Sequence, residues 1–177
     1  MTLRILGGSL KSRVLKTPSS ATRPTTALLR KSIFDTLAPY ILESYFLDIC
    51  AGTGAMGLEA LSRGAAHTTF IEKDKKAALF LRENIKNLGL EKKSLLIQDD
   101  FQKALSFLSK KGQMFDIIYV DPPYSLASFH LILLNFLEEN PLLTKGGILF
   151  LEEGLPSCLN WESCKFSSLA YKQSKKF

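Results

Sequence analysis

The chain alternates between short apolar runs and longer segments in which apolar residues recur at helical spacing. The short runs predict buried strands at 46–50, 68–72, 95–98, 115–120 and 148–152. The segments between them predict helices at 55–63, 74–88, 101–110 and 128–137. Strands that alternate with helices form a parallel sheet covered on both faces, so the pattern predicts a doubly wound, Rossmann-like α/β fold.

Local signals mark where several helices begin and end. Asp74 is suited to cap a helix that stops at Gly89, and Gly64 closes the helix before it. Ahead of the first main strand, Thr25-Thr26 offers a cap for a helix over 27–37 that Pro39 ends. The residues expected to form the buried stripe of that helix are Leu28, Ile33, Phe34 and Leu37.

The first residues predict a small β-hairpin ahead of the main fold. Residues 3–6 and 13–16 form its strands around Gly7-Gly8-Ser9, and a loop rich in Ser, Thr and Pro follows over 17–26. With 177 residues, of which 46% are hydrophobic, the chain is expected to be one domain. Within it, we expect a basic hairpin and loop at 1–26 and the main core at 27–177.

Composition narrows the function classes. No apolar run is long enough to span a membrane, and the chain does not open on a signal-peptide hydrophobic stretch. Three cysteines without CxxC spacing indicate reduced thiols in a cytoplasmic protein. Two histidines and no Cys/His cluster make a metal site improbable.

Positive charge is concentrated at the N-terminus. The net charge is +6, and no acidic residue precedes Asp35. Such a segment would neutralise phosphates, which favours contact with nucleic acid. An organellar transit peptide and a plain solvated surface are the competing interpretations. The basic residues of the segment are Arg4, Lys11, Arg13, Lys16, Arg23, Arg30 and Lys31.

Every predicted strand of the main sheet ends in an acidic residue. In a doubly wound sheet, ligands lie beyond the carboxyl ends of the strands, at the switch point. Some of these acids are expected to be helix caps or solvated ends, a fair interpretation of Asp99 and Glu153. The acids at the strand ends are Asp48, Glu72, Asp99-Asp100, Asp121 and Glu152-Glu153.

The segment from Gly52 to Gly57 fits the GxGxxG pattern of a dinucleotide site, so an NAD-dependent oxidoreductase must be weighed. Asp48 argues against it, because its carboxylate would repel a pyrophosphate at the helix N-terminus. The same carboxylate suits S-adenosylmethionine (SAM), which carries an ammonium and a sulfonium. Glu72, placed to accept ribose hydroxyls, serves both cofactors.

Asp121-Pro122-Pro123-Tyr124 follows the apolar run 115–120. Two prolines fix successive φ angles and remove N–H donors, so the Asp121 carboxylate and the Pro122 carbonyl can accept from the two N–H groups of a base amine. Tyr124 offers a ring on which the base can stack. After a glycine loop, this turn favours methyl transfer from SAM to an exocyclic amine; the alternative is a structural proline loop.

These residues resemble the RsmD-type methyltransferases, which modify guanine N2 in bacterial small-subunit (16S) ribosomal RNA, and the resemblance spans nearly the whole chain. Arg4-Ile5-Leu6-Gly7-Gly8 is similar to the N-terminal hairpin of the family, and Arg23-Pro24-Thr25-Thr26 is similar to its RPT segment. The segment 47–65 resembles the cofactor loop and its helix. Glu72, Asp74 and Asn84 match the next block, and 121–124 matches the catalytic one.

The resemblance implies a class I methyltransferase fold, SAM as cofactor, no metal, and a monomer that acts in the cytoplasm on small-subunit ribosomal RNA or an assembled 30S particle. The SAM site would consist of Asp48, Gly52, Gly54 and Glu72, with Asp100 and Phe101 at the adenine end. Asp121, Pro122 and Tyr124 would hold the target guanine. Arg4, Lys11, Arg13 and Arg23 would contact RNA.

Two alternative functions are open, and the sequence differs from the family pattern in one respect. A DNA adenine or cytosine amino-methyltransferase shares the DPPY turn, but no stretch is long enough for a separate target-recognition domain. A catalytically silent module that binds SAM or RNA is the alternative from another class. Family members continue past a segment like 169–177 with a glycine and one more strand, which pairs antiparallel within the sheet. The sequence does not predict that final strand for this chain.

Overall fold

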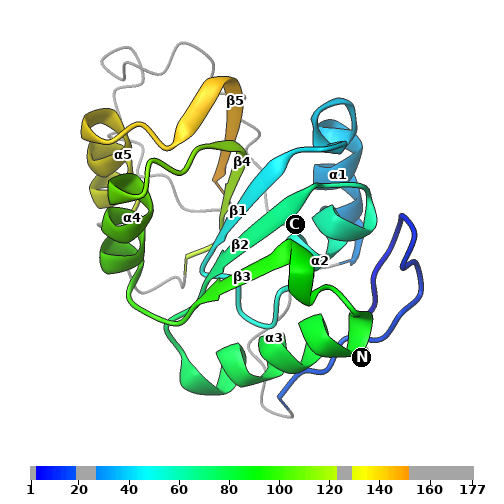
Figure 1. Ribbon diagram of the computed structural model, residues 1–177. Helices are drawn as coiled ribbons and strands as arrows, with labels where there is room; N and C mark the ends of the chain where they lie inside the picture. Colours follow the sequence, from blue (N-terminus) through cyan, green and yellow to red (C-terminus); the bar gives the residue numbers. More distant parts are fainter. Residues whose placement is uncertain (1–2, 19–26, 123–128, 152–177) are drawn as a thin grey trace.

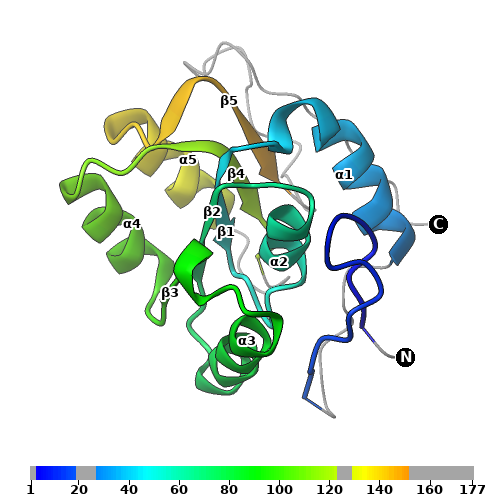
Figure 2. The same cartoon turned by 45° about the vertical axis from the view of Figure 1, so that its right-hand side comes forward.

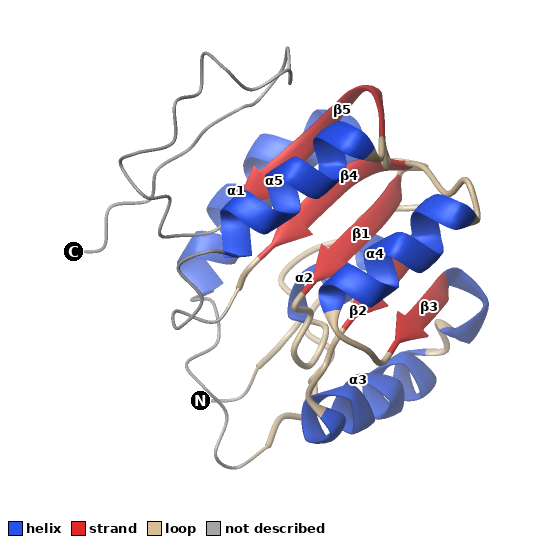
Figure 3. Ribbon diagram, turned by 90° about the vertical axis from the view of Figure 1, so that its left-hand side faces the viewer, coloured by secondary structure: helices blue, strands red, loops and turns tan. Residues whose placement is uncertain are grey.

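A computed structural model describes residues 3–18, 27–122 and 129–151. Its centre is a five-stranded sheet in the order β3-β2-β1-β4-β5. All neighbouring strands pair in parallel, and the five arrows point the same way in Figure 3. The strands are β1 (Tyr45–Ile49), β2 (His67–Ile71), β3 (Ser94–Ile97), β4 (Phe115–Val120) and β5 (Leu143–Leu151).

Helices cover both faces of the sheet, as the sequence predicted (Figure 1). On one face lie α1 (Ala27–Ile41), α2 (Ala55–Ser62) and α3 (Lys75–Leu88); on the other lie α4 (Phe101–Lys110) and α5 (Phe129–Glu139). A short 3-10 turn, η1 (Glu91–Lys93), precedes β3. None of the helices in the described ranges is both long and apolar enough to cross a membrane.

The strand order places a switch point beside β1. From β1 the chain moves outward through β2 to β3, and it then returns to the other side of β1 to form β4 and β5. The helices that come next in the chain after β1 and β4 lie on opposite faces of the sheet, α2 on one and α5 on the other. A crevice between such strands is where ligands bind in open α/β sheets.

Most predicted helix ends are confirmed. The Asp74 carboxylate accepts a hydrogen bond from the Ala77 N–H at 2.7 Å, and Gly89 adopts a left-handed conformation at the end of α3. Pro39 does not end α1, which continues to Ile41. A proline so near the end of a helix removes few hydrogen bonds, and the buried side chains of Leu37 and Ile41 hold the last turn against the core.

The expected buried stripe of α1 is partly wrong. Ile33, Phe34 and Leu37 are buried, but Leu28 is 79% exposed. The buried positions are mostly three or four residues apart, and this series includes Arg30 instead of Leu28. Strand β5 also begins five positions before the predicted start at 148, because an irregular register near Phe115 lets it continue the pairing back to Leu143.

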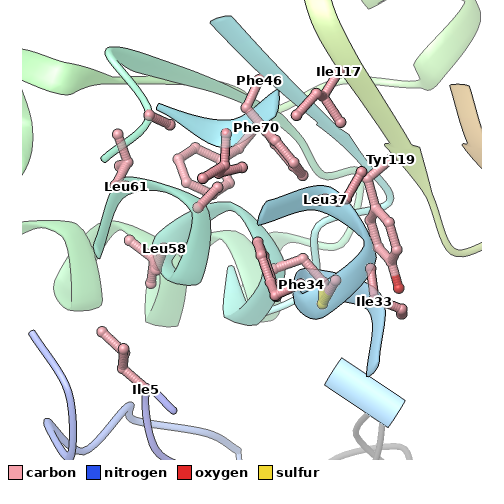
Figure 4. Close-up of a cluster of buried hydrophobic side chains, with 14 of the residues drawn as sticks. Ile5, Ile33, Phe34, Leu37, Phe46, Leu58, Leu61, Phe70, Ile117 and Tyr119 are labelled. Carbon is pink, nitrogen blue, oxygen red and sulfur yellow. The ribbon is translucent and has the colours of Figure 1, made fainter. Parts of the chain in front are cut away.

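The N-terminal hairpin forms, but as a single antiparallel bridge between Arg4 and Val14. The N–H of Leu15 donates to the Leu3 carbonyl at 2.9 Å, and the N–H of Ile5 donates to the Arg13 carbonyl at 3.0 Å. Figure 2 shows the hairpin (dark blue) beside α1, α2 and α3. Figure 4 shows the Ile5 side chain below Leu58 of α2, so the hairpin is part of the core on this face.

Candidate active site

A glycine loop carries the chain from β1 into α2. Cys50, Gly52 and Gly54 all have positive φ angles, of 64°, 57° and 87°. The Gly54 N–H closes the turn on the Ala51 carbonyl at 2.8 Å. Left-handed geometry at three positions within five residues reverses the chain tightly, and glycine adopts it without strain at two of them.

The two glycines differ in their surroundings. A Cβ atom at Gly52 would meet no atom within 4 Å, whereas one at Gly54 would lie 2.3 Å from the Leu81 Cδ1. Gly54 therefore fits against α3, while Gly52 borders open space. A ligand could approach the backbone closely at Gly52, as a cofactor loop requires.

Asp48 is buried beneath this loop, with 1% of its surface exposed. Its Oδ2 accepts a hydrogen bond from the Gly57 N–H at 2.9 Å, in the first turn of α2. The positive end of the helix dipole stabilises the carboxylate there. Asp48 therefore anchors the loop and places negative charge where a pyrophosphate would otherwise bind.

Glu72 follows β2 and holds the loop from the other side. Its Oε2 accepts from the Gly52 N–H at 2.6 Å, and its Oε1 accepts from the Asp74 N–H at 2.7 Å. Burial raises the pKa of Glu72, and the backbone hydrogen bonds oppose that rise. Each carboxylate oxygen has a second lone pair, so the group can still accept two ribose hydroxyls.

Acids near the carboxyl ends of four strands influence the Cys50 thiol. Burial is the main cause that raises the pKa of the Cys50 thiol to about 12, and carboxylates add to it. A thiol with this pKa stays protonated at neutral pH and is a poor nucleophile. The contributing carboxylates are those of Glu72, Asp48, Asp121 and Asp100, which come from β1 itself and from the segments after β2, β3 and β4.

Asp100 and Phe101 lie where β3 leads into α4. Asp100 caps the helix through the Gln102 N–H at 3.1 Å, and its other oxygen pairs with the Lys73 Nζ at 3.1 Å. The Phe101 ring packs on Phe129 of α5 at 4.1 Å between centroids. An acid beside a partly buried aromatic ring offers both an acceptor and a face to a planar ligand.

The predicted catalytic residues follow β4. The Asp121 N–H donates to the Ile49 carbonyl at 3.3 Å, which places Asp121 beside the glycine loop across the switch point. Asp121 is partly exposed and Pro122 is buried. Tyr124 lies outside the described residues, as does Arg23 of the predicted RNA-binding set.

Within the described ranges, no group of three or more His, Cys, Asp or Glu side chains is arranged to hold a metal ion. The converging acids instead accept hydrogen bonds from backbone N–H groups, as Asp48 and Glu72 do.

The other predicted RNA-binding residues lie on the hairpin. Arg4 and Arg13 are exposed and donate to backbone carbonyls, of Ser12 at 3.0 Å and Asn87 at 3.1 Å respectively. Lys11 is exposed at the turn. Lys16, also part of the basic segment, forms an exposed ion pair with Glu83 at 2.8 Å. The contacts of Arg13 and Lys16 join the hairpin to α3, and the cationic residues stay at the surface.

Arg30, counted among the basic residues of the N-terminus, is not at the surface. It is 2% exposed, and its Nη2 donates to the Arg4 carbonyl at 2.8 Å. Burial lowers the pKa of Arg30, and the nearby Glu59 carboxylate opposes that shift. The residue therefore supports the hairpin from below and does not contribute to a phosphate-binding surface.

Three polar residues that fasten the hairpin were not assigned this role from the sequence. The Glu59 carboxylate accepts from the Leu6 N–H at 2.7 Å, and the Ser62 hydroxyl accepts from the Leu10 N–H at 3.0 Å. Asn84 binds both polar backbone groups of Lys16. The available signal was the presence of polar residues on the buried faces of α2 and α3.

A parallel sheet in this order, with a glycine loop after its first strand and an acid after its second, has the architecture of a class I methyltransferase. The chain matches the family described as Conserved hypothetical protein 95 over residues 3–173. It is 38% identical over 165 residues to Ribosomal RNA small subunit methyltransferase D of Escherichia coli K12, covering 90% of this chain and 81% of that protein. The chain therefore belongs to the family of ribosomal RNA small subunit methyltransferase D.

Solved structures agree with the fold. The Escherichia coli protein yhhF superposes with a TM-score of 0.74 and 35% identity, over 86% of this chain and 81% of that one. A hypothetical protein of Thermus thermophilus gives a TM-score of 0.73 and 35% identity, over 84% of each chain. The doubly wound methyltransferase fold predicted from the sequence is confirmed.

Proposed function

We propose that this protein transfers a methyl group from SAM to the exocyclic N2 amine of a guanine in small-subunit ribosomal RNA. One observation carries the proposal: Asp48 and Glu72 hold the glycine loop that follows β1, and Asp121 is hydrogen-bonded to the end of β1 beside that loop. The family relative of Escherichia coli, which is named for methylation of small-subunit ribosomal RNA, supports the choice of RNA substrate.

The residues around the loop fit SAM. The backbone at Gly52 is open to a ligand, and Asp48 supplies negative charge for a cationic cofactor. Glu72 accepts the ribose hydroxyls, while Asp100 and Phe101 face the adenine, and Gly54 keeps the loop against α3. When bound, SAM supplies an electrophilic methyl carbon on a sulfonium.

Asp121, Pro122 and Tyr124 present the target base. The Asp121 carboxylate and the Pro122 carbonyl accept hydrogen bonds from the base, and the Tyr124 ring stacks on it. Held in this way, the N2 nitrogen directs its lone pair at the methyl carbon. As the nitrogen–carbon bond formed, the bond from the methyl carbon to sulfur would break and leave S-adenosylhomocysteine. The amine would become acidic and lose a proton to water, so no strong general base is needed. Positioning and charge stabilisation lower the barrier.

Asp121 also favours guanine over adenine. A carboxylate only accepts hydrogen bonds, and the pairing edge of guanine presents N1–H and N2–H donors. Adenine presents an acceptor at the ring position. This complementarity favours the guanine assignment over a DNA adenine amino-methyltransferase.

The proposal includes the arrangement of the chain. Residues 1–177 act as one domain and as a monomer in the cytoplasm, with the hairpin and loop of 1–26 as the RNA-binding part and 27–177 as the SAM-binding core. Arg4, Lys11, Arg13 and Arg23 contact RNA phosphates, in free ribosomal RNA or in an assembled 30S particle.

The test is methyl transfer to ribosomal RNA and 30S particles from a strain that lacks the enzyme, with the modified base mapped. Asp121→Ala is expected to lose turnover while SAM affinity stays nearly unchanged, because the side chain acts on the amine and not on the cofactor. Asp121→Asn separates charge from shape, and Glu138→Ala, on the exposed face of α5, is the matched control. Near-normal turnover in Asp121→Ala would refute the mechanism.

A further inference from the structure

Asn84 of α3 links two segments that are far apart in the sequence. Its Oδ1 accepts from the Lys16 N–H at 2.8 Å, and its Nδ2 donates to the Lys16 carbonyl at 3.0 Å. The same Nδ2 donates to the Thr53 carbonyl at 3.1 Å. The side chain thus binds the hairpin through two hydrogen bonds and the glycine loop through a third.

The hydrogen bonds at residue 84 require an amide side chain. Asn84 is 1% exposed, and these three bonds use both amide protons and one oxygen lone pair. Rotating the amide by half a turn would set its N–H groups against the Lys16 N–H and its oxygen against two carbonyls. Aspartate lacks the donors, and alanine would leave buried backbone groups without partners. Only an amide of this length satisfies all three.

Thr53 lies between the two glycines that shape the cofactor loop. The loop has three anchors: Glu72 on Gly52, Asp48 on Gly57, and Asn84 on Thr53. Asp48 and Glu72 belong to strand ends. Asn84 alone among these anchors also binds the hairpin.

We propose that Asn84 is a positioning residue that couples the N-terminal hairpin to the glycine loop. A cofactor that stabilises the loop then stabilises the docked hairpin, and RNA that holds the hairpin raises the affinity of the loop for the cofactor. Such coupling is reciprocal. The inference rests on the proposed function in taking the loop as the SAM site and the basic hairpin as the RNA side.

Amide hydrogen exchange provides the test, with S-adenosylhomocysteine as an unreactive probe of the loop. In the wild type, saturating probe is expected to slow exchange severalfold at Ile5 and Leu15, whose N–H groups are bonded within the hairpin and not to Asn84. In Asn84→Ala the probe is expected to bind about tenfold more weakly. At saturation it should no longer slow exchange at either amide.

Ser62→Ala is the matched control. It removes two hydrogen bonds from the hairpin turn, to Leu10 and Gly7, but none from the glycine loop. Hairpin exchange should be faster throughout in this variant, yet the probe should still slow it. Equal loss of the response in Ser62→Ala would place the coupling in α2 and overturn the role of Asn84.

Asn84→Asp provides a second variant in case alanine prevents folding. It keeps the acceptor for the Lys16 N–H and loses both donors, so it should also lose the response to the probe. If the wild-type hairpin does not respond to bound probe, the coupling is refuted while SAM binding stands. If the response is present but no methyl reaches ribosomal RNA, the proposed function fails and the coupling remains.

Discussion

Glu72 holds the glycine loop in place, and it is also one of the residues proposed to bind SAM. It fastens the glycine loop and the start of α3 through its two oxygens. The same buried carboxylate is proposed to accept the SAM ribose hydroxyls. Burial raises the pKa of Glu72 above the ordinary value of 4.5. The side chain therefore takes up a proton at a higher pH than an exposed glutamate does.

The first prediction is that SAM affinity declines as the pH falls through the raised pKa of Glu72. Ribose hydroxyls donate to the ionised carboxylate, so affinity is complete above that pKa and is lost below it. The stability of the unliganded protein depends on pH in the opposite direction. The contribution of Glu72 to stability is lost as the pH rises through the same window, because burial disfavours the charged form. Calorimetry across pH measures the affinity. Glu72→Ala should bind SAM about 1–3 kcal/mol more weakly and lack this decline.

A second prediction distinguishes the two loop glycines. Gly52→Ala meets no atom, so the variant should fold at a strain cost of about 1 kcal/mol but lose SAM affinity, because the methyl group occupies the ligand's side of the loop. Gly54→Ala meets Leu81 and should instead lower the melting temperature. Thermal unfolding and calorimetry on both variants test this; equal SAM affinity in Gly52→Ala and the wild type would contradict it.

At the scale of single residues, the sequence predicted those features that depend only on neighbouring residues in the chain. The Asp74 cap and the Gly89 stop depend on the backbone of one helix end, and both are confirmed. The burial of Arg30 depends on the hairpin that covers it, a contact between segments that helical spacing alone does not reveal. Asn84 was matched to the family by position, but its partners Lys16 and Thr53 become visible only in the fold.

Among the elements, the hairpin differs most from its appearance in the sequence. The sequence predicted a basic hairpin ahead of the main fold, yet Ile5 and Leu15 are buried and α2 and α3 hold its backbone. Its turn also fits closely, because a Cβ atom at Gly8 would lie 1.8 Å from the Ser62 carbonyl oxygen. The charged groups are therefore presented from a fixed position rather than from a flexible tail.

The third prediction concerns those charges. Replacing Lys11, Arg13 and Lys16 with Gln should weaken RNA binding and reduce its salt dependence, by about one unit of slope for each phosphate that the protein no longer neutralises. SAM affinity should stay nearly the same, since the exposed contacts of Arg13 and Lys16 are weak and Asn84 still binds the backbone of residue 16. Binding of ribosomal RNA at several salt concentrations provides the measurement.

A charge-matched control lies on the opposite face of the sheet. Lys103, Lys110 and Lys111 are exposed at α4 and the residue that follows it, and their replacement with Gln removes the same charge. This variant should keep most of its RNA affinity. If both triple variants lose binding equally, RNA responds only to net charge, and the hairpin has no special role.

On the scale of the whole molecule, the alternation of strands and helices predicted the fold class but not the strand order. The order β3-β2-β1-β4-β5 depends on which strands pair across long sequence separations. The pattern of apolar runs along the sequence does not reveal which strands become neighbours. The predicted position of the site, at the carboxyl edge of the sheet, did not depend on that order. Parallel strands bring their carboxyl ends to one edge, so acids that end each run must gather there wherever each strand lies.

The last prediction follows from that gathering of charge. SAM and S-adenosylhomocysteine should bind the protein, and NAD should not, because the loop is bordered by Asp48 and Glu72 and has other carboxylates nearby. A pyrophosphate would meet this negative field at close range in a partly buried site, where Coulomb repulsion is only weakly screened. The sulfonium and ammonium of SAM are attracted by the same field. Calorimetry with each ligand at one ionic strength decides between them: NAD binding tighter than SAM would overturn the cofactor assignment, whatever the outcome of the RNA experiments.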